Sequence, residues 1–194
     1  YEDAGIFYAL WCDSPVPVVI NPADDVEARA AVKAAFEYVG PVYLRFGRLA
    51  VPVVNDESNY HFEIGKGIVL KEGSDVALIA TGLEVYEALE AAKMLEKDGV
   101  HAKVINIHTI KPIDEELIVS AAEECKKVVT IEEHSVIGGL GSAVCDVLSE
   151  KMPCKVMKIG INDVFGESGP ALELIEKYGL DAKSIYQKVK AFIE

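Results

Sequence analysis

A histidine and two glutamates stand side by side in the stretch TIEEHSVIGGLGS, residues 130–142. The apolar run over 128–131 predicts a buried strand that ends just before Glu132, Glu133 and His134. Ligands of open α/β sheets bind beyond the carboxyl ends of the strands, so these side chains stand where chemistry would be expected. A histidine beside carboxylates could act as a general base or a metal ligand, but a hydrogen-bonded structural histidine is the commoner arrangement. The pattern therefore assigns no catalytic residue and no metal ligand.

Three glycines, Gly138, Gly139 and Gly141, follow directly and lead into a helix predicted over 141–149. Glycine lets the backbone turn tightly, and the N–H groups at the start of a helix attract anions. Together with His134, these glycines predict a possible anion-binding loop. Their spacing does not match the dinucleotide fingerprint GxGxxG, and close packing of a helix on a sheet is the commoner reason for such glycines.

Two arginines, Arg45 and Arg48, follow the apolar run over 42–44, which predicts another buried strand. Guanidinium is always charged and forks onto phosphate oxygens, so an arginine near the carboxyl end of a strand could bind a phosphorylated ligand. A lone arginine in a linker is more often solvated. Arg45, as a strand residue, could instead pair with a carboxylate.

The amino-terminal segment predicts one small βαβ unit. The apolar run at 17–21 indicates a strand buried on both faces, and Asp24 stands where a helix N-cap requires a short polar side chain. The alanine-rich helix extends to Tyr38 and precedes the strand at 42–44. One crossover unit over 17–46 cannot cover the faces of its own sheet, so we expect it to belong to a larger sheet.

Turn-forming residues over 51–64 predict a linker between a truncated first unit, 1–50, and a complete second unit, 65–194. In the second unit, strands and helices alternate at the spacing of a mostly parallel sheet. Its predicted strands are 67–70, 76–80, 103–107, 128–131 and 154–159, and its predicted helices are 85–95, 114–122, 141–149, 168–178 and 182–192. The predicted fold class is therefore α/β, a doubly wound, mostly parallel five-stranded sheet preceded by a partial βαβ unit.

The composition excludes several classes of partner. A net charge of −13 argues against nucleic acids and anionic membranes, because such partners require a basic surface. No run of about 18 apolar residues is present, and the amino end shows no signal-peptide pattern. The four cysteines form no CxxC pair and stand near no histidine at zinc-ligand spacing, which predicts a reducing cytoplasm and no metal site. The chain begins with Tyr1, so we expect a fragment or a processed product.

Several long motifs resemble the transketolase family and occur in the family's order. PADDVEARAAVKAAFEYVGPVYLRFGR, at 22–48, is similar to the end of the pyrimidine-binding domain that contacts thiamine diphosphate in transketolases. The 73–114 stretch that begins GSDVALIATG resembles the opening of the C-terminal domain, and EEHSVIGGLGSAV with VFGESGPALELIEKYGLD at 164–181 resembles its later part. The chain is most similar to the C-terminal subunit of split transketolases. Residues 1–17 match poorly and receive no function.

The resemblance implies an enzyme that uses thiamine diphosphate and a divalent metal, Mg or Ca, to move a two-carbon ketol unit between sugar phosphates. Arg48 matches the arginine that binds the phosphate of the sugar in this family. The family's diphosphate and metal motif and its activating glutamate match nothing in this sequence. We therefore expect no catalytic residue and no bound cofactor in this chain alone, and we expect it to be inactive until an N-terminal transketolase subunit joins it. The resemblance also implies a cytoplasmic homodimer.

Alternatives remain at this point. 1-Deoxyxylulose-5-phosphate synthase and the beta subunit of 2-oxo-acid dehydrogenases share the architecture, although the phosphate motif or the EEH and FGESG stretches usually differ in them. From another class, the chain could be a non-catalytic module that serves assembly or binds a small anion at the 134–142 loop.

Overall fold

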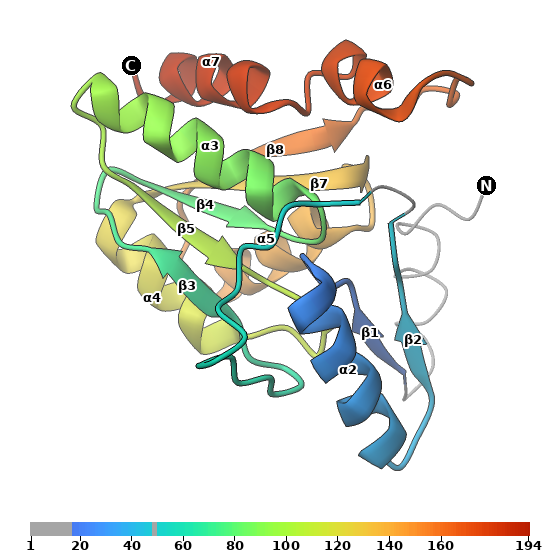
Figure 1. The fold of residues 1–194 in the computed structure, drawn as a ribbon. Helices are drawn as coiled ribbons and strands as arrows, with labels where there is room; N and C mark the ends of the chain where they lie inside the picture. Colours follow the sequence, from blue (N-terminus) through green and yellow to red (C-terminus); the bar gives the residue numbers. More distant parts are fainter. Residues whose placement is uncertain (1–16, 48–49) are drawn as a thin grey trace.

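The computed structural model describes residues 17–47 and 50–194, which form two sheets. One sheet has three strands in the order β2-β1-β6, and the other has five strands in the order β3-β5-β4-β7-β8 (Figure 1). No helix within these residues is long and apolar enough to cross a membrane.

The five-stranded sheet confirms the predicted fold class. Strand β4 pairs in parallel with β5 and β7, β7 pairs in parallel with β8, and only β3 at the edge is antiparallel to its neighbour β5. The strands are β3 (Ile68–Lys71), β4 (Val76–Ala80), β5 (Ala102–Asn106), β7 (Lys127–Ser135) and β8 (Lys155–Ile161). Parallel strands buried on both faces read as continuous apolar runs, which is why β4 could be predicted to the residue.

Helices cover both faces of this sheet, so the fold is doubly wound (Figure 1). Side chains alternate along β4: Leu78 faces the cluster beneath α3 and α7, whereas Ile79 faces the cluster beneath α4 and α5. The helices are α3 (Glu84–Lys97), α4 (Glu115–Cys125), α5 (Leu140–Lys151), α6 (Ala171–Lys177) and α7 (Ala182–Ile193). Helix α6 buries no residue. It begins at Ala171, three residues after the start at Ser168 that the sequence predicts.

The predicted βαβ unit is also present. Strand β1 (Val18–Ile20) pairs in parallel with β2 (Val42–Leu44), and α2 (Asp25–Glu37) connects them. Asp24 is the N-cap of α2, as its type predicts: its backbone is extended and its carboxylate accepts a hydrogen bond from Glu27 N at 2.9 Å.

A short strand that the sequence analysis did not predict joins the two units. Strand β6 (Thr109–Lys111) pairs antiparallel with β1, so the βαβ unit gains its third strand from the chain beyond the predicted linker. Asn21 N also donates to His108 O at 2.8 Å beside this pairing. The larger sheet expected around the βαβ unit is thus, within the described residues, a three-stranded one.

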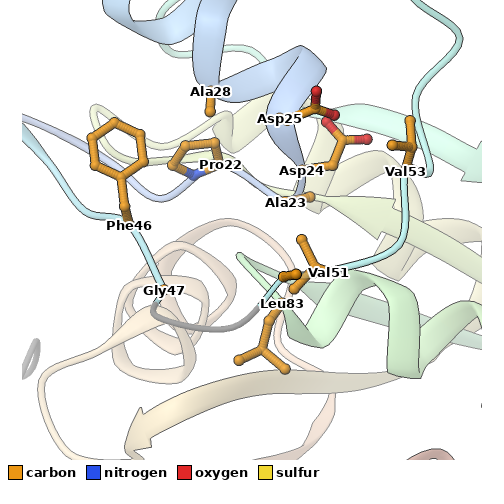
Figure 2. Close-up of a pocket in the computed structure, with 11 residues that line it drawn as sticks. Pro22, Ala23, Asp24, Asp25, Ala28, Phe46, Gly47, Val51, Val53 and Leu83 are labelled. Atoms are coloured by element: carbon orange, nitrogen blue, oxygen red, sulfur yellow. The ribbon is translucent and has the colours of Figure 1, made fainter.

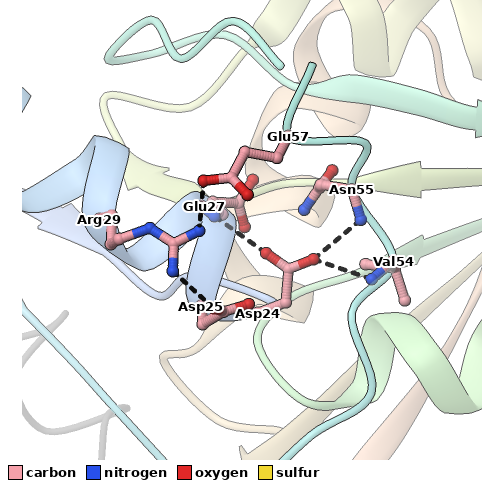
Figure 3. A network of polar contacts seen from close by, with 7 residues as sticks. All are labelled: Asp24, Asp25, Glu27, Arg29, Val54, Asn55 and Glu57. Atoms are coloured by element: carbon pink, nitrogen blue, oxygen red, sulfur yellow. Dashed lines mark hydrogen bonds and ion pairs between the residues drawn. The ribbon is translucent and has the colours of Figure 1, made fainter. Parts of the chain in front are cut away.

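Polar contacts hold the predicted linker against the start of α2 (Figure 3). Asp24 accepts hydrogen bonds from Val54 N and Asn55 N, each at 2.8 Å. The buried Glu27 accepts from the Tyr60 hydroxyl at 2.5 Å and from Asn106 Nδ2 at 2.9 Å. Residues 51–64 are therefore a packed connection between the units rather than a free spacer.

The carboxyl end of β7 differs from the prediction. The strand was expected to end at Ile131 but continues to Ser135, so Glu132, Glu133 and His134 lie inside it. The pairing with β8 shifts register between Ile131 and Ser135, which marks an irregularity in the strand. The polar residues made this part look like a loop, but they find partners in other elements: backbone N–H groups at the start of α5 for Glu132, and the Arg45 side chain for Glu133 and His134.

Candidate functional site

Glu132 occupies the start of helix α5. Its carboxylate accepts hydrogen bonds from Leu140 N and Gly141 N, both at 2.8 Å. A Cβ atom on Gly139 would lie 2.1 Å from Glu132 Oε2, so only glycine leaves room for the carboxylate there. Gly138, with φ +75°, turns the chain, and its N–H donates to Ser142 Oγ at 2.8 Å. The predicted glycine loop thus surrounds an anion that the protein itself supplies.

Burial controls the acidity of this carboxyl group. Glu132 is almost wholly buried, and burial raises its pKa to about 7 even though the two N–H donors oppose the rise. An outside anion at the predicted loop would have to displace Glu132 from both N–H groups. The binding of an outside anion by Gly138, Gly139, Gly141 and His134 stays a prediction. It would require free energy to displace Glu132 from these two N–H groups.

The side chain of His134 contacts Arg45. A guanidinium N–H of Arg45 donates to His134 Nδ1 at 2.7 Å. Arginine can only donate, so Nδ1 is the acceptor and the imidazole is neutral with its proton on Nε2. Burial and then the charge of Arg45 lower the pKa of His134 to about 2. The ring therefore cannot serve as a base at neutral pH through Nδ1.

Two glutamates, the fully buried Glu84 and the partly buried Glu133, complete this group, which we call the Arg45 cluster: Arg45, Glu84, Glu133 and His134. Arg45 lies 3.6 Å from Glu133 Oε1, so the competing prediction that Arg45 pairs with a carboxylate is confirmed. Burial raises the pKa of Glu133, and Arg45 opposes the rise.

Glu84 is the member that the sequence analysis missed. It is the first residue of α3 and is fully buried, and its carboxyl oxygens have no hydrogen-bond partner among the described residues. Burial, followed by the charge of Glu133, raises its pKa well above the ordinary value. An acidic residue in the first turn of a helix is usually exposed and interacts favourably with the helix dipole. The sequence pattern therefore did not indicate that Glu84 is buried.

A hollow of about 350 Å³ lies near this cluster, between the start of α2, the chain after β2 and the start of α3 (Figure 2). Figure 2 shows Phe46 and Pro22 on one side and Val51 and Leu83 on the other. Its lining is mostly apolar and comprises Pro22, Ala23, Asp24, Asp25, Ala28, Phe46, Gly47, Ala50, Val51, Val53 and Leu83.

Arg48, the predicted phosphate ligand, lies outside the described residues. Gly47 and Ala50, the described residues on either side of the 48–49 segment, both line the hollow. Across residues 17–47 and 50–194, no three His, Cys, Asp or Glu side chains group into a possible metal site.

The comparisons with known proteins agree with this architecture. The family model described as "Transketolase, C-terminal domain" matches residues 65–185. A 6-deoxy-6-sulfo-D-fructose transketolase subunit from Clostridium sp. strain MSTE9 is 45% identical over 88% of this chain and 53% of its own length. A 1-deoxy-D-xylulose-5-phosphate synthase from Heliobacterium modesticaldum is 40% identical over 88% of this chain but only 27% of its own length.

A solved structure described as "Split gene transketolase, inactive beta4 tetramer" is 53% identical and superimposes with a TM-score of 0.86. The similarity covers 90% of this chain and 57% of that one, and the chain likewise spans about half the length of its first curated relatives. The matched domain is the five-stranded unit, and the relatives extend the similarity into the βαβ unit. The chain therefore belongs to the transketolase family, in which residues 65–185 form the C-terminal domain.

Proposed function

We propose that this chain is the C-terminal part of a thiamine-diphosphate-dependent transketolase that transfers a two-carbon ketol unit between sugar phosphates. The observation that carries the proposal is the match of residues 65–185 to the family, together with relatives that are themselves transketolase subunits. In this proposal an N-terminal transketolase subunit or domain is the partner. The whole enzyme works in the cytoplasm and has no nucleic acid or membrane as a partner.

In this proposal, the N-terminal partner supplies the residues that bind the diphosphate and metal of the cofactor. When bound, thiamine diphosphate supplies the carbanion chemistry, and a divalent metal, Mg or Ca, holds its diphosphate. The described residues group no ligand set for such a metal, and we assign no cofactor contact to them. Calorimetry of this chain alone with thiamine diphosphate and Mg should show no binding, and a micromolar site would contradict the assignment.

The contribution of this chain to the substrate site is the phosphate contact of Arg48. Its support is the GPVYLRFGR motif and the position of Gly47 and Ala50 at the hollow. In the complete enzyme, Arg48→Ala should raise KM for a ketose phosphate by about tenfold to a hundredfold, because a charge-assisted contact is lost. The matching unphosphorylated ketose should lose less than threefold. Equal losses for both donors would show that Arg48 does not contact the phosphate.

The assembly proposed is a homodimer of complete enzymes. The family resemblance supports this proposal. The related split-gene protein, by contrast, is described as a tetramer of its beta chain alone. That description also fits the expectation that such a chain is inactive by itself.

The second candidate function is that of a 1-deoxyxylulose-5-phosphate synthase, which the 40% identical relative favours. A synthase of this kind or a 2-oxo-acid dehydrogenase decarboxylates a 2-oxo acid, whereas ketol transfer releases no carbon dioxide. The complete enzyme should therefore consume a ketose phosphate only when an aldose phosphate is present, and it should release no carbon dioxide from pyruvate. Release of carbon dioxide from pyruvate at a comparable rate would overturn the proposal in favour of the synthase or dehydrogenase.

The non-catalytic alternative has less support. An anion-binding module at the 134–142 loop would require the displacement of Glu132 from Leu140 N and Gly141 N. An assembly module predicts that the enzyme's activity survives removal of this chain.

A further inference from the structure

The turn between β4 and α3 packs directly against the βαβ unit. Thr81 Oγ1 donates to Asn21 O at 3.4 Å, and a Cβ atom on Gly82 would lie 2.6 Å from Asn21 Nδ2. Gly82 has φ +60°, so glycine suits this position in both backbone and space. Leu83, the next residue, lines the hollow. We call residues 81–84 the α3 turn; it forms the contact between the two units together with the end of β1.

The last residue of the α3 turn is a buried carboxyl group without a partner. Glu84 is fully buried, and neither of its carboxyl oxygens has a hydrogen-bond partner within the part of the chain that the structure describes. Glu132 is buried to a similar depth but accepts two backbone N–H groups. A carboxylate at the place of Glu84 would lose its water and gain no donor in return, so ionisation inside the closed contact is costly.

Negative charges from three elements oppose the ionisation of Glu84 further. They are Glu133 of β7, Glu87 of α3 and Asp181, the N-cap of α7. Lys188 of α7 favours the ionised form, but its effect is the smallest of these, and its ammonium already donates to Gly179 O at 2.7 Å.

The βαβ unit brings a positive charge to the same place. The Arg45 guanidinium lies 3.6 Å from Glu133 Oε1 and donates to the neutral His134 at 2.7 Å. An ionised Glu84 would add a second buried carboxylate beside the one that Arg45 pairs with. The contact between the units therefore accommodates Glu84 best as an uncharged carboxyl group.

We propose that Glu84 makes the contact between the βαβ unit and the C-terminal domain sensitive to pH: the contact is closed while Glu84 holds its proton and opens when the proton is released to solvent. In the open form, water reaches the α3 turn and supplies the hydrogen bonds that the carboxylate lacks in the closed form. The inference concerns this chain itself and does not depend on the proposed ketol transfer.

The direction of the effect follows from the two forms of Glu84. Burial raises its pKa well above 4.5 in the closed form, whereas contact with water returns it to that ordinary value in the open form. Between these two pKa values, opening releases one proton, so the ratio of open to closed form should rise about tenfold per pH unit. The closed contact is thus most stable below pH 4.5, and the rise stops above the pKa of the closed form.

Hydrogen exchange of the intact chain from about pH 5 to about pH 9, corrected for the intrinsic exchange rate, measures this opening. The reporters are Asn21 N, which donates to His108 O across the two units at 2.8 Å, and Val85 N, which donates to Gly82 O at 3.2 Å. Their protection should fall about tenfold per pH unit and should stay below that of the β4 amides. No dependence on pH, or reporters as protected as β4, would overturn the proposal, because the contact would then not open separately.

Two variants identify the group that titrates. Glu84→Gln keeps the shape of the uncharged carboxyl group and cannot ionise, and Glu84→Met replaces it if glutamine prevents folding. Both should remove a tenfold dependence per pH unit at the reporters. Any slope that remains belongs to Glu133, whose pKa burial also raises. Glu96→Gln is the matched control on the same helix: it removes a half-exposed carboxylate that pairs with Lys71 and should behave like the original.

An unchanged slope in the Glu84 variants would overturn the proposal and assign the titration to Glu132 or Glu133 instead.

Discussion

Glu132 shows how one buried side chain changes the meaning of a motif. The glycines at the start of α5 predicted a possible anion-binding loop, and in the structure the carboxylate of a residue of the preceding strand occupies the helix start. The sequence could not reveal this, because the strand was predicted to end at Ile131, just before Glu132. Only the extension of β7 to Ser135 brings its side chain beneath Leu140 and Gly141.

Replacement of Glu132 by glutamine should change how stability depends on pH. The pKa of the folded group is raised to about 7 from an ordinary value of 4.5. Between pH 4.5 and pH 7, Glu132 of the folded protein keeps a proton that the unfolded chain has lost. The contribution of Glu132 to the free energy of unfolding is therefore largest below pH 4.5 and declines as the pH rises to 7. Relative to Glu132→Gln, the original protein should lose about 3 kcal/mol of unfolding free energy across that window.

Urea unfolding from pH 4.5 to pH 8 measures this difference. The opposing contributions of His108 and His134, whose pKa values are lowered by burial, are common to both proteins and cancel. Glu123→Gln, at an exposed position of α4, serves as control and should run parallel to the original. A parallel curve for Glu132→Gln would mean that burial does not perturb Glu132.

At the level of helices and strands, the starts of α2 and α4 could be predicted from their caps. Asp24 and Asp114 are acidic residues before alanine- or leucine-containing helices, and each accepts a hydrogen bond from the third residue of its helix. Strand β6 could not be predicted, because a three-residue strand beside a proline has no period to detect. The predicted end of β7 was wrong because the polar residues after Ile131 have hydrogen-bond partners in Arg45 and α5, which are distant in sequence.

Asp24 does more than cap α2, so its removal should be costly. Asp24→Ala deletes the cap and the hydrogen bonds from Val54 N and Asn55 N, and we expect a loss of about 3 kcal/mol in unfolding free energy. Asp25→Ala removes an exposed ion pair with Arg29 and should cost less than about 1 kcal/mol. Urea unfolding of both variants compares them directly. A small, equal effect would mean that the linker is not held by Asp24.

Across the whole molecule, the two units differ greatly in the size of their cores. Two large clusters of buried residues lie on the faces of the five-stranded sheet. Within residues 17–47 of the βαβ unit, the cluster that the structure describes has three buried members, Val18, Ile20 and Ala31. The unit boundaries at 50 and 65 remain a prediction, since β6 and the contacts of Asp24 cross them.

Limited proteolysis of the intact chain tests those boundaries. Cleavage should concentrate within residues 1–64 and leave a stable fragment that begins near Gly65, because the larger cores belong to the second unit. The β1–β6 pairing is the feature that would oppose this result. If the first segment resists protease as long as the second, the two units share one core and the boundary is wrong.

The central claim is that this chain completes a transketolase, and reconstitution measures it most directly. The chain is mixed with its N-terminal partner, thiamine diphosphate and Mg, and transfer of a two-carbon unit from a ketose phosphate to an aldose phosphate is followed. Each component alone should be inactive, and activity should rise with this chain to a saturating ratio. Full activity of the N-terminal partner without this chain, or no activity in the saturated mixture, would contradict the account.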